Sequence, residues 1–171
     1  GLEALGYATE DARNYVMAAC WEFIIPGRGM DIVNIGALPF ANVVDRVIRE
    51  HLREVHSLEE IKPLIREAIF ADVRRTVAER GSLYVIPSPY LSLFFEGCLE
   101  NDRDISLGCR YNNWGLHGTG VAPAADMMAA VDQVVFHGNT SPDELLAAMA
   151  ANFEGYDVLH DRLKYHCPKA G

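Results

Sequence analysis

Helical patterns alternate with short apolar segments along most of this 171-residue chain. The apolar run over residues 16–25 predicts a buried strand, and Pro39 can open a helix over residues 40–52. Residues 107–121 predict a short strand that runs into a glycine-rich loop, and the helical pattern resumes from Pro123. Because helices and buried strands that alternate in this way pack in layers around a sheet, the sequence predicts an α/β fold.

Residues that favour helix starts support further helices. Thr9 can cap a short helix whose first turn holds Asp11, where the positive end of the helix dipole stabilises a carboxylate. Ser57 and Glu60 form a capping-box pattern before a helix over residues 61–80. Near the C-terminus a cap, a first-turn proline and a capping-box partner are supplied by Ser141, Pro142 and Glu144.

Composition and charge narrow the class of protein. Hydrophobic residues make up 50% of the chain, so it can bury a core sufficient for one domain. The formal net charge is -9 and the 15 Lys and Arg residues are scattered, which argues against nucleic acid or a membrane as partner. No apolar run reaches the roughly 18 to 20 residues that span a bilayer, and the first residues lack a signal-peptide pattern. We therefore expect a cytoplasmic protein that binds a small molecule or another protein.

The four cysteines lie far apart and form no CxxC pair. Their spacing fits neither a zinc site nor a disulfide scaffold, so we expect free thiols and no metal centre. Cys20 and Cys98 are each followed at the second position by a glutamate. Taken alone, Cys20 can be a buried structural thiol and Glu22 a solvated residue at a strand edge. In one extended strand both side chains would point to the same face, so they can also act together.

Several stretches resemble the glycyl radical enzymes, the family that includes pyruvate formate-lyase. "GYATEDARNYVMAACWEF" at residues 6–23 and "NIGALPFANVVDRVI" at residues 34–48 resemble the region around the active-site cysteine of this family. The shared elements are a Glu-Asp-Ala-Arg helix start, a Cys-x-Glu tripeptide and an asparagine-glycine segment that leads into a helix. Residues 87–136 resemble a later segment of the family, and residues 141–171 continue it in the family's order.

The resemblance implies that Cys20 and Glu22 are catalytic. In the family, a glycine-centred radical takes a hydrogen atom from the active-site cysteine, and the resulting thiyl radical abstracts hydrogen from a substrate carbon. Cys20 matches that cysteine, and Glu22 would act as general base for a substrate hydroxyl or carboxyl proton. Cys98 lies in the later family segment and is expected to be structural, whereas Cys109 and Cys167 are interpreted as packing or loop thiols.

The loop "YNNWGLHGTG" is the best candidate for substrate contacts outside the cysteine segment. Its glycines permit close backbone approach, and Asn112, Asn113 and His117 offer side chains that form hydrogen bonds. We therefore predict that these three residues bind substrate. The alternative is a glycine-rich turn in which His117 bonds only to the backbone.

The residue before the cysteine separates reaction types within the family. Pyruvate formate-lyase uses two adjacent cysteines, the second of which carries an acyl group as a thioester, whereas Ala19 precedes Cys20 here. The sequence therefore predicts a radical lyase that dehydrates, eliminates from or decarboxylates a small hydroxylated or carboxylated metabolite. The alternatives are acyl transfer of the formate C-acetyltransferase type and a non-catalytic, truncated relative that acts as a scaffold or binding module.

The fold implied by the resemblance is a ten-stranded α/β barrel of two half-sheets, with the cysteine on a loop that reaches its centre. We expect residues 1–171 to form a single partial domain of such a barrel. No Arg-Val-x-Gly-Tyr-like radical motif occurs among them, so the C-terminal glycyl radical domain is expected to be absent from this chain.

The same resemblance implies the cofactor and the partners. This segment would bind no cofactor itself, and an S-adenosylmethionine iron-sulfur activase would install the glycyl radical on the C-terminal segment. The expected partners are the small-molecule substrate, the activating enzyme and the remaining part of the same polypeptide. When complete, the protein is expected to form a homodimer.

Overall fold

The computed structural model describes residues 1–18, 22–81 and 85–170. The chain divides into two compact units: unit 1 comprises Gly1–Gly36 with Glu79–His117, and unit 2 comprises Ala37–Ala78 with Gly118–Gly171. Each unit is thus built from segments that lie far apart in the sequence, and each has its own cluster of buried apolar residues. The expectation of a single partial domain stays a prediction.

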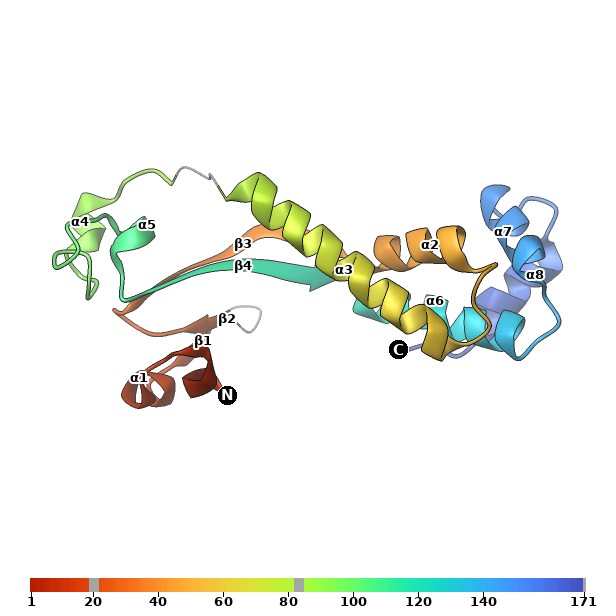
Figure 1. The fold of residues 1–171 in the computed structure, drawn as a ribbon, viewed down its shortest axis with the longest axis horizontal. Coiled ribbons are helices and arrows are strands. Elements are labelled where there is room, and N and C mark those ends of the chain that lie inside the picture. Colours follow the sequence, from red (N-terminus) through yellow and green to blue (C-terminus); the bar gives the residue numbers. More distant parts are fainter. Residues whose placement is uncertain (19–21, 82–84, 171) are drawn as a thin grey trace. The chain divides into compact units, whose positions relative to one another are not determined.

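Unit 1 begins with two short helical segments and a β-hairpin (Figure 1). In chain order these are η1 (Leu2–Leu5), α1 (Thr9–Arg13), β1 (Val16–Ala18) and β2 (Glu22–Ile24). The two strands pair antiparallel, with Ala18 opposite Glu22. The prediction of one continuous strand over residues 16–25 is therefore wrong. An apolar run indicates burial, but it does not show whether the run pairs with itself.

The N-terminus of α1 also differs from the prediction. Thr9 is the first helical residue, and the capping position is held by Ala8, whose side chain cannot accept a hydrogen bond. The Ala8 N–H donates instead to the Tyr111 hydroxyl over 3.1 Å. The predicted Thr9 cap is therefore wrong, because a distant side chain satisfies the backbone at this helix end.

The two longest described strands are β3 (Gly29–Pro39) and β4 (Tyr111–Thr119), which pair with each other. β4 includes the segment predicted as a glycine-rich loop, so that prediction is wrong. Glycine in a strand often marks a position where a neighbouring group approaches closely. A Cβ atom at Gly118 would collide with the Phe40 ring, so the glycine here reflects packing within a strand.

The rest of unit 1 is formed by two short helices, α4 (Pro89–Ser92) and α5 (Ile105–Gly108). Asp104 connects them: its carboxylate accepts from the Ser88 N–H over 2.7 Å and from the Ser92 hydroxyl over 3.0 Å, and it caps α5. A small buried cluster in this unit comprises Cys98, Ile105 and Cys109, with Met30 and Phe95 packed against it.

Unit 2 is mainly helical. Its helical elements are α2 (Phe40–His51), α3 (Leu58–Arg80), α6 (Val121–Val131), η2 (Asp132–Phe136), α7 (Pro142–Ala150), α8 (Asp157–Asp161) and η3 (Arg162–His166). α2 buries Val44, Val47 and Ile48, which share one face at helical spacing. These side chains join the larger of the two cores, to which Leu52, Val134 and Ala148 contribute fully buried side chains.

Three of the helix predictions that rest on local signals are confirmed, those for α2, α3 and α7. α2 spans nearly the whole predicted segment, and the Ser57 hydroxyl accepts from the Glu60 N–H over 3.3 Å at the start of α3. The Glu60 carboxylate accepts in turn from the His56 N–H over 2.8 Å. The Ser141 hydroxyl accepts from the Glu144 N–H over 3.1 Å and caps α7.

Helices and strands together confirm a mixed α/β chain. The described residues form two sheets of two strands each, so the ten-stranded barrel is not itself present in them. Across residues 1–18, 22–81 and 85–170, no helix combines the length and apolar character needed to cross a membrane.

Candidate active site

Glu22 and Asn113, two of the residues predicted from the sequence, line the same pocket in unit 1. The pocket has a volume of about 220 Å³, and its lining consists of Glu22, Phe23, Asp31, Asn113, Trp114 and Gly115. Glu22 opens β2, Asp31 lies in β3 and Asn113 lies in β4. Because β3 pairs with β4, Asp31 and Asn113 meet although 82 positions separate them in the sequence.

The Asn113 amide is held in one orientation by two hydrogen bonds. Its Nδ2 donates to the Tyr7 hydroxyl over 2.8 Å and to Asp31 Oδ1 over 2.7 Å. The Tyr7 ring contacts the rings of Phe23 and Tyr111, with centroid distances of 5.3 and 4.6 Å. Both amide hydrogens of Asn113 are therefore used, which leaves its carbonyl oxygen as the atom that can accept from a ligand.

Two of the three residues predicted to bind substrate, Asn112 and His117, do not belong to the lining of this pocket. Asn112 Nδ2 donates to the Cys109 carbonyl over 2.7 Å, and neighbouring residues of a strand face opposite sides, so Asn112 and Asn113 are directed apart. His117 is exposed. Cys20 lies outside the described residues. The catalytic and substrate-binding roles of these residues stay predictions.

Sequence reasoning missed two polar residues of the site, Asp31 and Tyr7. Asp31 lies inside β3 and Tyr7 precedes α1, and neither residue belongs to a local sequence motif. Their shared partner, Asn113, is 82 and 106 positions away. Short sequence patterns carry no information about contacts between residues so far apart. This group of residues is therefore recognised only in the folded chain.

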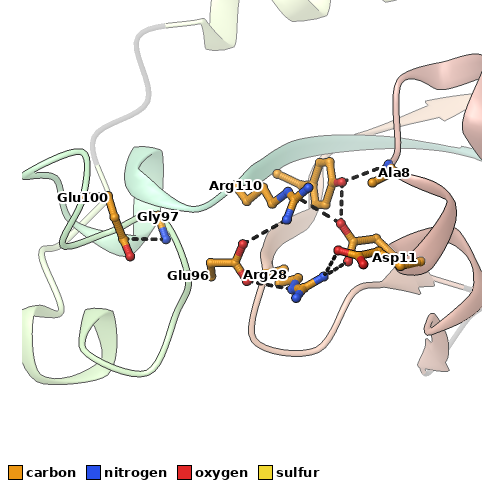
Figure 2. A network of polar contacts seen from close by, with 9 residues as sticks. Ala8, Asp11, Arg28, Glu96, Gly97, Glu100 and Arg110 are labelled. Atoms are coloured by element: carbon orange, nitrogen blue, oxygen red, sulfur yellow. Dashed lines mark hydrogen bonds and ion pairs between the residues drawn. The ribbon is translucent and has the colours of Figure 1, made fainter.

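A buried carboxylate fixes both flanks of the hairpin that carries Glu22 (Figure 2). The Asp11 residue is 1% exposed and accepts from the Arg28 guanidinium and from the Tyr111 hydroxyl, the latter over 2.6 Å. Arg110 Nε lies 3.6 Å from the same carboxylate. Asp11 precedes β1 and Arg28 follows β2, so this one side chain ties both ends of the hairpin to the start of β4.

Glu96 completes the network by binding both cations. Its carboxylate lies 2.7 Å from Arg28 Nε and 2.9 Å from Arg110 Nη1. The hydrogen bond from Tyr111 lowers the pKa of Asp11, burial opposes this shift, and Arg28 lowers the pKa further. The pKa of Arg28 is raised, chiefly by its hydrogen bond to Asp11. Both groups are therefore charged at neutral pH, and the network consists of ion pairs.

We expect Asp11→Asn to destabilise the fold in a pH-dependent way. The folded-state pKa of Asp11 lies below its ordinary value, so its charge stabilises the fold above about pH 4, and this contribution is lost as the pH falls through the folded-state pKa. The urea midpoint of the variant should therefore be lower than that of the wild type at pH 7, and the difference should shrink below about pH 4.

The matched control for that substitution is Asp143→Asn, which removes an exposed ion pair with Arg53. Exposed pairs contribute little because water screens them, so this variant should differ much less from the wild type at every pH. An Asp11→Asn variant that is as stable as Asp143→Asn at pH 7 would show that the network does not hold the hairpin.

The burial of the other cysteines agrees with packing roles. Cys98 and Cys109 are buried with their Sγ atoms 3.8 Å apart, and the Cys109 thiol donates to the Ile105 carbonyl over 3.3 Å. Burial, helped by the neighbouring Cys98, raises the pKa of Cys109 to about 12. A thiol that stays protonated is a poor nucleophile and a poor metal ligand. Within the described ranges, no group of three His, Cys, Asp or Glu side chains could hold a metal ion.

Comparison with known proteins shows what this chain is similar to. A family model described as pyruvate formate lyase-like matches residues 73–171. Trans-4-hydroxy-L-proline dehydratase of Clostridioides difficile is 27% identical over 188 residues, which cover 97% of this chain and 24% of the dehydratase. The glycerol-bound B12-independent glycerol dehydratase from Clostridium butyricum has a TM-score of 0.76 at 25% identity, covering 98% of this chain and 24% of the other. A glycyl radical enzyme from Archaeoglobus fulgidus has a TM-score of 0.77 at 26% identity, covering 99% and 24%.

The mixed α/β structure is therefore similar to the corresponding part of solved glycyl radical enzymes. The chain belongs to the pyruvate formate lyase-like family of glycyl radical enzymes, as its sequence predicted, and its relatives include dehydratases. It spans about a quarter of the length of these relatives, 24% in each case.

Proposed function

We propose that this chain is the active-site-cysteine segment of a radical lyase that dehydrates a small hydroxylated metabolite. Cys20 would become the thiyl radical that abstracts hydrogen from the substrate, and Glu22 would be the general base. The glycyl radical would reside in another segment of the same polypeptide, where an S-adenosylmethionine iron-sulfur activase would install it. When present, this radical supplies the oxidation of the Cys20 thiol.

The main support for the proposal is that Glu22 lines a pocket in a chain of the pyruvate formate lyase-like family. Glu22 pairs across the hairpin with Ala18, and it lines a pocket together with the oriented Asn113 amide. A carboxylate at such a pocket can accept the proton of a bound hydroxyl group. The dehydratases among the relatives favour water elimination over acyl transfer, and Ala19 in place of a second cysteine supports the same conclusion.

Cys20 would transfer hydrogen atoms in the proposed reaction, and Glu22 would transfer a proton. The Cys20 thiyl would take a hydrogen atom from a substrate carbon that bears a hydroxyl group, leaving a carbon radical. Glu22 would accept the proton of that hydroxyl, and the hydroxyl group on the neighbouring carbon would leave as hydroxide. The proton held by Glu22 would convert hydroxide to water, and the Cys20 thiol would return its hydrogen atom to the product radical. Atoms and electrons balance, because the thiyl radical is regenerated.

Anaerobic activation of the full-length protein tests this proposal. We expect a glycyl radical signal in electron paramagnetic resonance, together with conversion of a hydroxylated substrate to a carbonyl compound and water. Deuterium on the carbon that loses hydrogen should slow turnover if the Cys20 thiyl performs the abstraction. A radical-loaded protein that consumes none of a panel of diols, amino alcohols and hydroxy acids would contradict the proposed reaction.

A further inference from the structure

Tyr7 connects the hairpin that carries Glu22 with the strand that carries Asn113. Its ring meets the ring of Phe23, the neighbour of Glu22 in β2, edge-on, with centroids 5.3 Å apart and an angle of 84° between the ring planes. The same ring packs against Tyr111 in β4, with a centroid distance of 4.6 Å. Tyr7 therefore joins two of the strands that line the pocket.

The geometry of β4 brings the Tyr7 hydroxyl to the Asn113 amide. Tyr111 and Asn113 are two positions apart in this strand, so their side chains share one face. With its ring against Tyr111, Tyr7 places its hydroxyl oxygen 2.8 Å from Asn113 Nδ2 and accepts one of the amide hydrogens. One placement of the side chain thus provides both the ring contact and the hydrogen bond.

Two acceptors on different segments set the orientation of the Asn113 amide. Asp31 Oδ1 lies 2.7 Å away, and a carboxylate can only accept, so the atom that faces it must be the amide nitrogen. The Tyr7 hydroxyl accepts the second hydrogen of the same nitrogen. Because the terminal torsion of an asparagine side chain is soft, one hydrogen bond alone leaves the amide plane free to turn. The second bond fixes the plane and, with it, the direction of the carbonyl oxygen.

We infer that Tyr7 is a positioning residue of the proposed reaction. Its hydroxyl holds the Asn113 amide so that the carbonyl oxygen can accept a hydrogen bond from a substrate hydroxyl group. The inference rests on the proposed function, because it concerns the same pocket. Tyr7 is not among the described residues that line this pocket, so it would act on the substrate through Asn113.

A double-mutant cycle on the full-length protein tests this role. Tyr7→Phe keeps the aromatic ring and removes the hydroxyl group, and Asn113→Ala removes the amide. Calorimetry before activation measures the affinities for propane-1,2-diol, 2-aminoethanol and lactate, which represent diols, amino alcohols and hydroxy acids. The compound that binds the wild type most tightly is used for the cycle. After activation, kcat and KM for the same compound are determined and kcat is normalised to radical content.

Tyr7→Phe is expected to lower the affinity by about three- to tenfold, the change that corresponds to one hydrogen bond of ordinary strength. In the Asn113→Ala background the same substitution should change the affinity by less than about twofold, because the hydroxyl no longer has an amide to orient. A purely structural hydroxyl would give the same loss in both backgrounds. In the activated protein the loss should appear mainly in KM, since the carbonyl oxygen would bind the hydroxyl group before and during the reaction.

Tyr15→Phe is the matched control. The Tyr15 ring also packs against Phe23, with a centroid distance of 5.1 Å, but its hydroxyl is not one of the two groups that hold the Asn113 amide. The substitution removes the same hydroxyl group from a second aromatic neighbour of the hairpin. The affinity of this variant should stay within about twofold of the wild-type value.

The inference is overturned if Tyr7→Phe binds as tightly as the wild type, if its loss is the same with and without the Asn113 amide, or if the wild type binds none of the three compounds. Affinity and turnover separate this inference from the proposed function. Coupling between Tyr7 and Asn113 in a radical-loaded protein without turnover would support the role of Tyr7 and contradict the radical lyase. Turnover without any coupling between the two residues would do the reverse.

Discussion

In the full-length, anaerobically activated protein, Cys20→Ala is expected to abolish turnover while the glycyl radical remains detectable by electron paramagnetic resonance. Alanine offers no hydrogen atom that the glycyl radical can exchange, so the radical would form but could not be passed to the substrate. Turnover and spin content are measured on the same sample, because an inactive variant without the radical would show only failed activation.

Cys98→Ala is the matched control, because Cys98 belongs to the second Cys-x-Glu tripeptide of the chain. Cys98 is 2% exposed and its sulfur lies 3.8 Å from that of Cys109, an environment that serves packing. The variant should therefore keep substantial activity per radical. An active Cys20→Ala protein and an inactive but radical-loaded Cys98→Ala protein would show that the other tripeptide is catalytic.

Glu22→Gln is expected to lower turnover by roughly 10²- to 10⁴-fold, the usual contribution of acid–base catalysis. Glutamine keeps the shape of the side chain and most of its hydrogen bonds, but it cannot accept the substrate proton. The fold and the radical yield should be unaffected, since Glu22 is only partly buried at the start of β2. Turnover normalised to radical content, measured for wild type and variant after identical activation, gives the size of the effect.

Glu100→Gln is the control for the glutamate. Glu100 holds the same position in the second tripeptide, and its carboxylate accepts from the Gly97 N–H over 2.9 Å at the surface (Figure 2). A surface substitution of this kind usually changes stability by less than about 0.5 kcal/mol and should leave turnover near the wild-type value. If Glu22→Gln behaves in the same way, Glu22 is not the base, and only the family pattern would support Cys20.

The local signals in the sequence were sufficient to predict most of the larger helices and the family. Ser57 and Ser141 cap their helices through residues three positions away, so the necessary partners lie within one turn of each cap. The apolar stripe of α2 likewise follows from residues that are close in sequence. The Cys-x-Glu tripeptide occurs twice in the chain and is ambiguous alone. The resemblance of its flanking residues to the family predicts that the first tripeptide is catalytic, and this stays a prediction.

The pairing of the strands, and the set of side chains that meet at the pocket, could not be predicted from the sequence. Residues 16–25 form two paired strands instead of one, and the glycine-rich segment after Cys109 is a strand because β3 pairs with it. Asp31 joins Asn113 from 82 positions away, and Asp11 meets Tyr111 from 100 positions away. Hydrogen bonds between strands can join residues at any distance along the chain, whereas helix caps join residues within one turn. The larger helices and the family could therefore be predicted from the sequence, and the residues that line the candidate site are seen only in the folded chain.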